Sequence, residues 1–399
     1  MSTPGVRKKT PLALSLSKGR TEPVEGPSSA QRRSRRATVA GTVLECLVVL
    51  AVVALLLEGM SRIVHLNKRP AIPAVSDPDG ALRMPAGFDA TIQLAGREPF
   101  PLCTDAQGLR VADCSAATLA AETDVLVVGD SQALGWGFDF GKTFGALVAA
   151  ELPGRRVGSA RLMAAAATDV ESLQSWASDY RHHREGGQAA APLLNIVSLN
   201  LGNDLDEMFF SRSSVTIPRF RAAREWLAVH STVMADFTIA KNALFNAEWQ
   251  SPPGANPVLF ALDDAERATL ASAAAAAVER LARALPPARE TVVLLLPNDY
   301  QVQPGEFDKY RRFYPQAAQF ESWQRRIPQA VARLDALESE IATELQARGF
   351  RVAVPHEALK AVDPLTLFDR GSHHYSPLGQ RILARSILEA LHAGHGKLS

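Results

Sequence analysis

The chain has 399 residues, of which 47% are apolar and 21% are charged, and its formal net charge is +1. This apolar content is enough for a sizeable core, and a nearly neutral chain has no global charge that would attract nucleic acid, so we expect no nucleic-acid partner. The basic residues are unevenly distributed, because nine of them, against two acidic residues, precede Ala37.

The N-terminal region combines this basic segment with one long apolar run. Residues 1–36 show no apolar periodicity, so we expect a disordered cytoplasmic tail there. The run from Ala37 to Leu57 carries a single charge, Glu45. A helix of about 20 apolar residues spans the hydrocarbon core of a bilayer, so we predict a transmembrane anchor over residues 37–60. The alternatives are a buried core helix and a cleaved signal peptide, but the run is long for a signal peptide and no small-residue cleavage site follows it.

The arginine cluster Arg32–Arg36 orients this anchor. Positive charges stay in the cytoplasm, so we predict a single-pass membrane protein with an extracytoplasmic, periplasmic domain. The partners implied are the lipid bilayer and other proteins of the cell envelope. Cys103 and Cys114 fall on the outer side with a short polar loop between them. In an oxidising compartment such a pair forms a disulfide; the alternative is two unrelated thiols.

The remainder divides into a segment of residues 61–123, a domain of residues 124–392 and a tail of residues 393–399. The first segment includes a Pro-, Asp- and Gly-rich linker, Lys68–Asp89, and a candidate strand, Ala90–Leu94. In the domain, short apolar runs alternate with helical patterns, which predicts a parallel sheet of about five strands covered by helices on both faces. The expected strands are Val125–Val128, Arg156–Ala160, Leu193–Leu201, Thr291–Leu296 and Phe350–Val354, and the expected helices are Phe144–Leu152, Asp263 or Asp264 to Leu285, Gln329–Arg348 and Ser376–His392.

The stretch Leu205–Pro257 interrupts this alternation. It contains aromatic and basic residues and no clear strand, so we expect a mostly helical insertion. It follows the C-terminal end of a strand, where open α/β sheets bind their ligands, and we therefore expect it to shape substrate access.

Three polar motifs lie where they can reach the same edge of this sheet. Gly129–Ser131 follows the first strand directly, where Ser131 is exposed for nucleophilic attack or, alternatively, caps a helix. Asn203 follows the third strand and can donate its amide to an oxyanion, although Asn-Asp is also an ordinary loop opening. His374 precedes the last helix, with Asp369 upstream; a His-His pair in a loop is otherwise typical of a polar surface or a metal ligand.

Together these motifs resemble blocks I, III and V of the SGNH (GDSL-like) hydrolase superfamily: G-D-S, G-N-D and a late H-x-S-P-x-G. The stretch GDSQALGWGFDFGKTF is similar to block I of bacterial membrane-anchored members, and LLLPNDYQV resembles a segment common in that group. The resemblance implies a flavodoxin-like three-layer α/β/α fold and ester hydrolysis or acyl transfer without a cofactor. It makes Ser131 the nucleophile and an oxyanion donor through its N–H, Asn203 the second donor, and His374 the base.

Two features depart from the family pattern. The family places its aspartate two or three residues before the histidine, whereas Asp369 lies five residues before His374. Asp369 reaches His374 Nδ1 only if the loop bulges; with His373 as the base, the H-x-S-P-x-G register would be lost. The family's block II glycine is also missing, because the stretch from Arg161 to Thr168 has none, and an alanine N–H would have to replace it.

The leading hypothesis is an SGNH-type enzyme that hydrolyses or transfers an acyl group, such as acetyl, through a Ser131 acyl-enzyme. By analogy with membrane-tethered members, the substrate would be an ester or an acylated carbohydrate of the cell surface. The alternative is a catalytically degenerate binding or scaffold protein of the cell envelope. A metal-dependent hydrolase using His373 and His374 is a third hypothesis, but adjacent histidines do not usually converge on one ion, so we expect no metal.

Overall fold

The chain divides into two units, Met1–Leu57 and Glu58–Ser399. The computed structural model describes residues 29–66, 68–69, 71–73, 75–76, 82–94, 97–115, 122–152, 159–165, 168–187, 190–202, 204–209, 227, 229–234, 236, 262–302, 317–368 and 374–393. The predicted tails therefore lie largely outside the described residues, as does most of the predicted insertion. Of the insertion, the structure describes the short helix α6 (Asp204–Phe209) and a few residues between 227 and 236.

The first unit holds most of helix α1 (Ser29–Val64). The part Ala40–Val64 contains an 18-residue window with a mean hydropathy of 2.6 and is long and apolar enough to cross a membrane. The helix begins at Ser29, within the segment for which the sequence predicted a disordered tail. Arginine has a high helix propensity, so the basic residues extend the apolar helix rather than end it.

The second unit is built on a mixed sheet of eight strands in the order β10-β9-β8-β6-β7-β5-β4-β3. Five of them are parallel, and the first in the chain lies between the second and third, which is the flavodoxin-like order. The parallel strands are β6 (Val125–Gly129), β7 (Ala160–Ala164), β8 (Leu194–Asn200), β9 (Glu290–Leu296) and β10 (Arg351–Ala353). The predicted fold class is confirmed, but the second strand was predicted at Arg156–Ala160 and lies at Ala160–Ala164, where all five residues are buried.

Three antiparallel strands extend this sheet beyond β7. They are β3 (Asp89–Ile92), β4 (Phe100–Thr104) and β5 (Arg110–Val111), and β5 pairs with β7 through Arg110 and Leu162. A disulfide joins Cys103 to Cys114 across this hairpin. The sequence analysis set these residues apart from the main domain, whereas they belong to its sheet. They cover the edge of β7, which would otherwise expose unpaired backbone groups.

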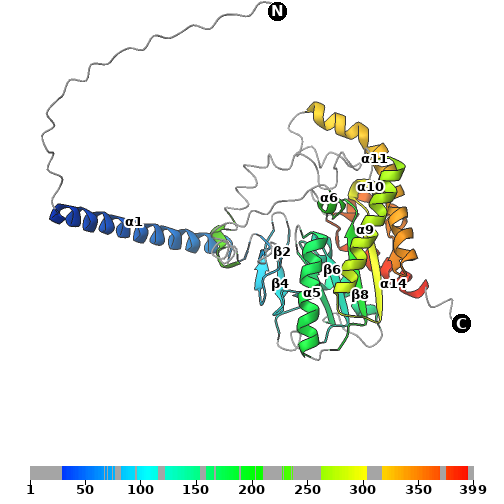
Figure 1. Cartoon of the computed structure of the whole chain (residues 1–399), viewed down its shortest axis with the longest axis horizontal. Coiled ribbons are helices and arrows are strands. Elements are labelled where there is room, and N and C mark those ends of the chain that lie inside the picture. Colours follow the sequence, from blue (N-terminus) through cyan, green and yellow to red (C-terminus); the bar gives the residue numbers. More distant parts are fainter. Residues whose placement is uncertain are drawn as a thin grey trace, which may run out of the picture. The chain divides into compact units, whose positions relative to one another are not determined.

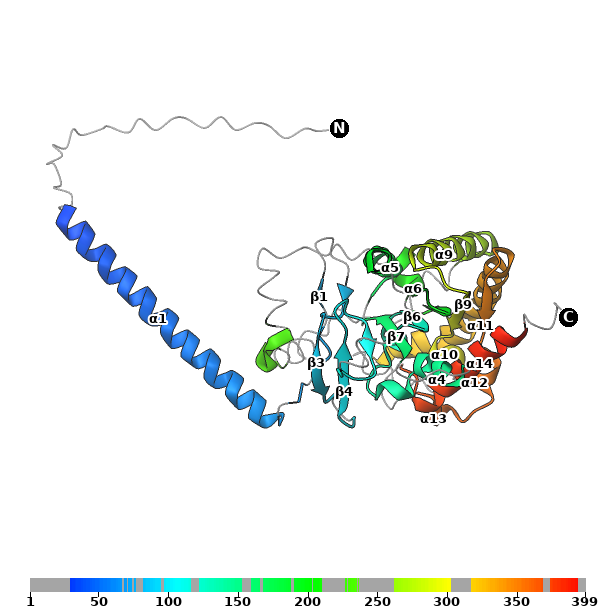
Figure 2. The same ribbon diagram turned by 90° about the horizontal axis from the view of Figure 1, so that it is seen from below.

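Helices cover both faces of the sheet (Figures 1 and 2). One face carries α5 (Val170–Gly187), α9 (Asp264–Ala284) and α11 (Ala317–Ala347), and the other carries α4 (Phe144–Glu151) and α14 (Pro377–Ala393). Helix α9 begins as predicted, with Asp263 and Glu266 forming a capping box. Helix α11 begins before the predicted Gln329 and continues through Pro328, which sequence reasoning treats as a boundary.

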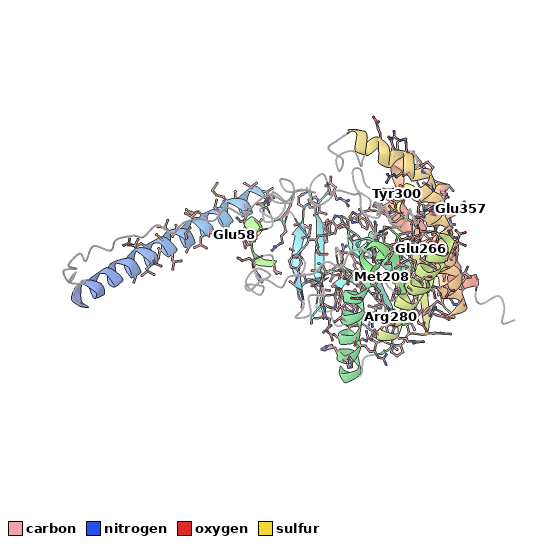
Figure 3. The ribbon with its side chains drawn as sticks, turned by 45° about the horizontal axis from the view of Figure 1, so that its top comes forward. Glu58, Met208, Glu266, Arg280, Tyr300 and Glu357 are labelled. Atoms are coloured by element: carbon pink, nitrogen blue, oxygen red, sulfur yellow. A yellow bond between two sulfur atoms is a disulfide. The ribbon has the colours of Figure 1, made fainter. Side chains whose placement is uncertain are left out.

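The end of α1 belongs to the second unit and contacts part of the insertion. The carboxylate of Glu58, labelled in Figure 3, accepts hydrogen bonds from Ser231 Oγ at 2.7 Å and from the backbone N–H of Thr232 at 3.0 Å. Ser61 Oγ donates to Asp236 Oδ2 at 2.7 Å. Farther along, Arg69 forms a bridge with Ile92 at the end of β3. These contacts tie the helix end to residues 231–236 and Arg69 to β3 within the second unit.

Candidate active site

Strand β6 ends in a tight turn that leads into the short helix α3 (Ser131–Leu134). A Cβ added to Gly129 would lie 1.9 Å from Ser198 Oγ of the neighbouring strand β8, so only glycine fits at this position. Asp130 caps the helix: its Oδ1 accepts the backbone N–H of Gln132 at 2.8 Å. Ser131 is consequently the first helical residue at the C-terminal edge of the sheet, where first-turn N–H groups have no partner within the helix.

His374 lies directly against this serine. Its Nε2 is 2.9 Å from Ser131 Oγ, and both residues are 9% exposed. Trp136, which follows α3, stacks on the imidazole with ring centroids 5.4 Å apart and an interplanar angle of 12°. A hydroxyl and an imidazole at this distance can pass a proton, which is the arrangement that activates a serine nucleophile.

Tyr375, which follows His374 in the loop before α14, is held by a backbone bridge and by its side-chain hydroxyl. Phe368 and Tyr375 form an antiparallel bridge, and Tyr375 Oη donates to Pro297 O at 2.8 Å after the end of β9. Burial, followed by the charges of nearby carboxylates, raises the pKa of Tyr375 well above its ordinary value, so the phenol stays a neutral donor. A Cβ on Gly379 would lie 2.8 Å from Leu367 O, which explains the glycine of the H-x-S-P-x-G motif.

Two buried glutamines connect the serine turn to this loop. Gln132 Oε1 accepts the backbone N–H of Tyr375 at 3.1 Å, and Gln380 Nε2 donates to Gln132 O at 3.3 Å. Gln380 Oε1 in turn accepts the N–H of Phe144 at 2.8 Å, at the start of α4. The sequence analysis identified neither glutamine nor Trp136 as site residues. The only local signal was that Gln132 and Trp136 fall within the extended block I motif.

The G-N-D region contributes a second polar network. Asn200 Nδ2 donates to Asp130 Oδ2 at 3.0 Å, and Asp204 Oδ2 accepts the N–H of Asn200 at 2.7 Å. This network fixes the end of β8 to the residue that precedes Ser131. Asn203, predicted as an oxyanion donor, lies outside the described residues.

Three other predicted features of the site lie wholly or partly outside the described residues. Asp369 and His373 lie outside the described residues, so the acid of the triad stays a prediction. After β7 the structure describes Ala165 but not the next two alanines, and the replacement of the block II glycine also stays a prediction.

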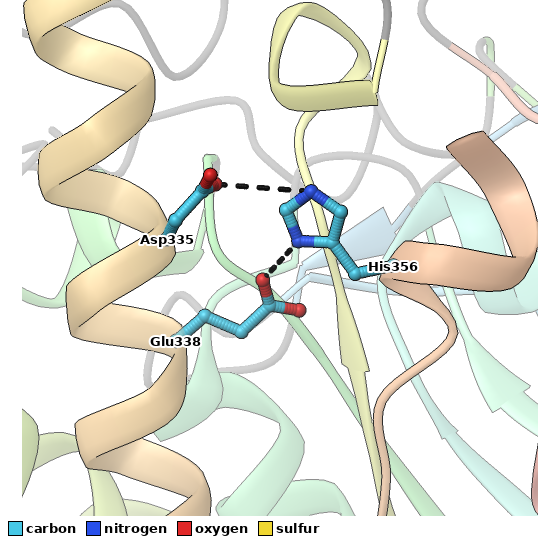
Figure 4. A group of neighbouring side chains, drawn as sticks. All are labelled: Asp335, Glu338 and His356. Carbon is cyan, nitrogen blue, oxygen red and sulfur yellow. Dashed lines mark hydrogen bonds and ion pairs between the residues drawn. The ribbon is translucent and has the colours of Figure 1, made fainter.

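Among the described residues, one group has side chains suited to a metal ion: Asp335, Glu338 and His356 (Figure 4). Its contacts are those of an ion-pair network. His356 Nδ1 lies 2.6 Å from Glu338 Oε2, and His356 Nε2 lies 3.8 Å from Asp335 Oδ1. Lys360 Nζ lies 3.9 Å from Asp335 Oδ2. Burial lowers the pKa of His356, but the hydrogen bond and charge of Glu338 and the charge of Asp335 outweigh it and raise the pKa above its ordinary value. Lys360 supplies a positive charge to this group, and the two carboxylates favour the protonated form of His356.

Several solved structures are similar to this chain at low sequence identity. An SGNH hydrolase from Slackia heliotrinireducens is 13% identical, with 68% of this chain and 100% of that chain covered and a TM-score of 0.31. A member of the lipolytic G-D-S-L family from Veillonella parvula is 11% identical, with 66% and 96% covered and a TM-score of 0.32. A catalytic mutant of Axe2, an acetylxylan esterase from Geobacillus stearothermophilus, is 12% identical, with 68% and 95% covered and a TM-score of 0.31.

These structural neighbours are distant, and their TM-scores are below 0.5. No protein-family model and no curated protein sequence matches the chain. The contacts of the site itself are therefore the basis for assigning its chemistry.

Proposed function

We propose that this chain is an SGNH-type serine esterase or acyltransferase that works through an acyl-enzyme on Ser131. The observation that carries the proposal is the 2.9 Å distance between Ser131 Oγ and His374 Nε2, two side chains of buried residues. A serine hydroxyl becomes a useful nucleophile only when a positioned base accepts its proton. The motif register and the geometry favour the same histidine.

In the proposed reaction, His374 Nε2 takes the proton of Ser131 Oγ as that oxygen attacks the ester carbonyl. The backbone N–H of Ser131 and the amide of Asn203 stabilise the oxyanion of the tetrahedral intermediate. His374 then returns the proton to the departing alcohol, and Asp369 holds the imidazole through Nδ1. A second hydroxyl attacks the acyl-serine: water gives hydrolysis, and a sugar hydroxyl gives acyl transfer.

We propose that this reaction takes place outside the cytoplasm, on an ester or acylated carbohydrate of the cell surface. Two features support this location. The apolar part of α1 is suited to anchor the chain in a bilayer, with the arginine-rich end in the cytoplasm. The disulfide between Cys103 and Cys114 fits an oxidising compartment.

The test uses the full-length chain purified in detergent micelles. Hydrolysis of p-nitrophenyl acetate and labelling by a fluorophosphonate probe are measured for the unmodified chain, for Ser131→Ala and for Ser178→Ala, a serine of α5 outside the site. We expect Ser131→Ala to abolish both signals and Ser178→Ala to retain them. Equal signals in the unmodified chain and Ser131→Ala would remove the catalytic proposal.

The degenerate alternative is favoured by the missing block II glycine and the unusual spacing of Asp369. It predicts a folded chain that neither hydrolyses the ester nor reacts with the probe. Hydrolysis and transfer are separated by adding an acetylated oligosaccharide together with an unacetylated acceptor. Mass spectrometry then shows either free acetate or an acetylated acceptor.

A further inference from the structure

The turn that follows α3, the short helix that begins with Ser131, is held by one buried arginine. Arg110 of β5 is fully buried. Its Nη1 donates to Leu134 O at 2.5 Å and to Gly135 O at 3.0 Å, and its Nη2 donates to Phe138 O at 2.7 Å. Carbonyls at the end of a helix have no partner within the helix and need donors from elsewhere. One guanidinium supplies donors to two carbonyls at the end of α3, those of Leu134 and its cap Gly135, and to the carbonyl of Phe138 farther along the turn.

Only an arginine suits this position. The guanidinium lies 5.6 Å from the ring centre of Phe100 and 6.0 Å from that of Phe140, both in the range of cation–π contact. Burial lowers the pKa of Arg110 to about 9, although the charge of Asp139 opposes this, so the group is cationic at neutral pH. A lysine has one compact ammonium and does not reproduce the planar fork.

The turn held in this way carries Trp136, the residue that covers the imidazole. Gly135 and Gly137 have φ values of +72° and +91°, so the backbone reverses through conformations that favour glycine. Arg97 Nη1 donates to Trp136 O at 2.6 Å. The indole ring then stacks on His374, whose Nε2 faces Ser131 Oγ.

The hairpin that bears Arg110 is itself tied down at two points. The disulfide between Cys103 and Cys114 closes it. Asp105, at its tip, accepts the N–H of Leu109 at 3.0 Å and pairs with Arg161 of β7 at 3.3 Å. A continuous series of described contacts therefore leads from the hairpin through Arg110 and the turn to Trp136 and His374.

We propose that Arg110 is a positioning residue for the reaction: it fixes the turn from Leu134 to Phe138 so that Trp136 holds the His374 imidazole against Ser131. This inference rests on the proposed function of Ser131 and His374. It assigns to the N-terminal hairpin, which precedes the first motif of the family, a part in ordering the site.

The experiment compares Arg110→Lys with Arg83→Lys in the full-length chain in detergent. Arg83 of the short strand β2 (Leu82–Arg83) is a matched control, because it also lies beside an indole ring, that of Trp176, and it donates to Asp179 of α5. We expect Arg110→Lys to lower kcat about 10- to 100-fold, as a displaced catalytic group does. KM should stay close to its unmodified value, because the defect acts on the transition state.

A double variant shows whether Arg110 acts through Trp136. Residues that act as one unit give non-additive losses, so Arg110→Lys combined with Trp136→Leu should be no slower than Trp136→Leu alone. Losses that multiply would contradict the proposal.

A readout independent of activity is the NMR signal of His374 in chains with ¹³C-labelled histidine, assigned by His374→Gln. The resonance and its pH titration should shift in Arg110→Lys and stay unchanged in Arg83→Lys. An unchanged resonance in folded Arg110→Lys overturns the proposal, whether or not the unmodified chain hydrolyses esters. An unmodified chain without Ser131-dependent hydrolysis refutes the proposed function instead. If Arg110→Lys does not fold, Arg97→Met, which removes one bond to the same turn, replaces it under the same criterion.

Discussion

At the scale of single residues, the site depends on positions where two segments approach too closely for a side chain. Gly129 lies against Ser198 of the neighbouring strand, and Gly379 lies against the carbonyl of Leu367. These glycines let the serine turn and the final helix pack tightly enough for a serine and a histidine to meet. Two of the motif glycines therefore have a steric reason.

The first prediction concerns Gly129→Ala. The added methyl group would overlap Ser198 Oγ, so we expect the variant to lose about 1–3 kcal/mol of stability, the usual cost of overpacking. Ser198→Ala in the same chain should recover part of this loss. The recovery should be incomplete, because the Cβ of Ala133 would still lie 2.8 Å from the new methyl group. Denaturant unfolding of the unmodified chain, Gly129→Ala and the double variant tests this; a Gly129→Ala chain as stable as the unmodified one would contradict it.

The second prediction concerns the proposed acid of the triad. Asp369→Asn should lower kcat about 10²- to 10⁴-fold, because an amide does not hold the imidazole in the required tautomer. His373→Gln should keep most of the activity, since His374 is the histidine placed against Ser131. If His373→Gln is the inactive variant and Asp369→Asn is not, the assignment of the acid and the base is wrong. Ester hydrolysis, with the number of active sites counted by a fluorophosphonate, gives both values.

At the scale of secondary-structure elements, the hairpin of β4 and β5 and the end of α1 both belong to the second unit, although they precede its parallel strands in the chain. The hairpin completes the sheet beyond β7 and supplies Arg110. At the end of α1, the carboxylate of Glu58 accepts hydrogen bonds from the backbone N–H groups of Thr232 and Val233. Neither element is a passive linker.

The third prediction concerns the disulfide of the hairpin. Its cysteines are 11 residues apart in sequence, and a crosslink that closes a loop of this size stabilises a fold by about 3 kcal/mol. The double variant Cys103→Ser, Cys114→Ser should therefore unfold at a lower temperature than the unmodified chain. A reducing agent should lower the unfolding temperature of the unmodified chain to that of the variant, and should leave the variant unchanged. Equal temperatures for all samples would exclude a stabilising role.

The fourth prediction concerns where the second unit begins. Chains that start at Glu58 keep the carboxylate that accepts the N–H groups of Thr232 and Val233, whereas chains that start at Lys68 lose it together with the Ser61–Asp236 bond. We expect the chain that starts at Glu58 to be more stable in solution than the chain that starts at Lys68. Glu58→Gln in the longer chain should remove part of this difference in stability. Thermal unfolding of the three proteins decides this, and a shorter chain of equal stability would argue that these contacts contribute nothing.

At the scale of the whole molecule, most of the parallel strands could be predicted from the sequence. The residues that hold these strands and the site in place could not. Strands such as β6 and β8 are continuous apolar runs, so their position follows from the sequence. Strand β7 was misplaced because Ala-Arg-Leu-Met-Ala has little β-propensity and places a charge in the interior. Arg161 is accommodated there by Asp105, which only the fold brings near.

The same limit applies to the site. Ser131 and His374 carry recognisable motifs, but Gln380 and Gln132 meet across 248 residues without any local pattern. Arg110, a full charge in the core, was hidden for a similar reason, since its acceptors are backbone carbonyls that no sequence pattern marks.

The fifth prediction concerns the stability of the second unit as a function of pH. Glu338 and Asp335 raise the pKa of His356 in the folded chain despite its burial. A raised folded pKa gives stability that is complete below the unfolded value, about 6.5, and is lost as the pH rises through the folded value. Denaturant midpoints should fall over this range in the unmodified chain, and His356→Gln should remove that part of the dependence. A variant with the same pH profile as the unmodified chain would contradict it.

The two reacting side chains, Ser131 and His374, are 243 residues apart in sequence. Because the ribosome makes the N-terminus first, the hydroxyl is synthesised long before the imidazole that would activate it. In the proposed mechanism, a nascent or prematurely terminated chain therefore lacks the base, and acyl chemistry on Ser131 would begin only after the last helix has docked. The proposed nucleophile would thus gain its base only once nearly the whole chain has been made.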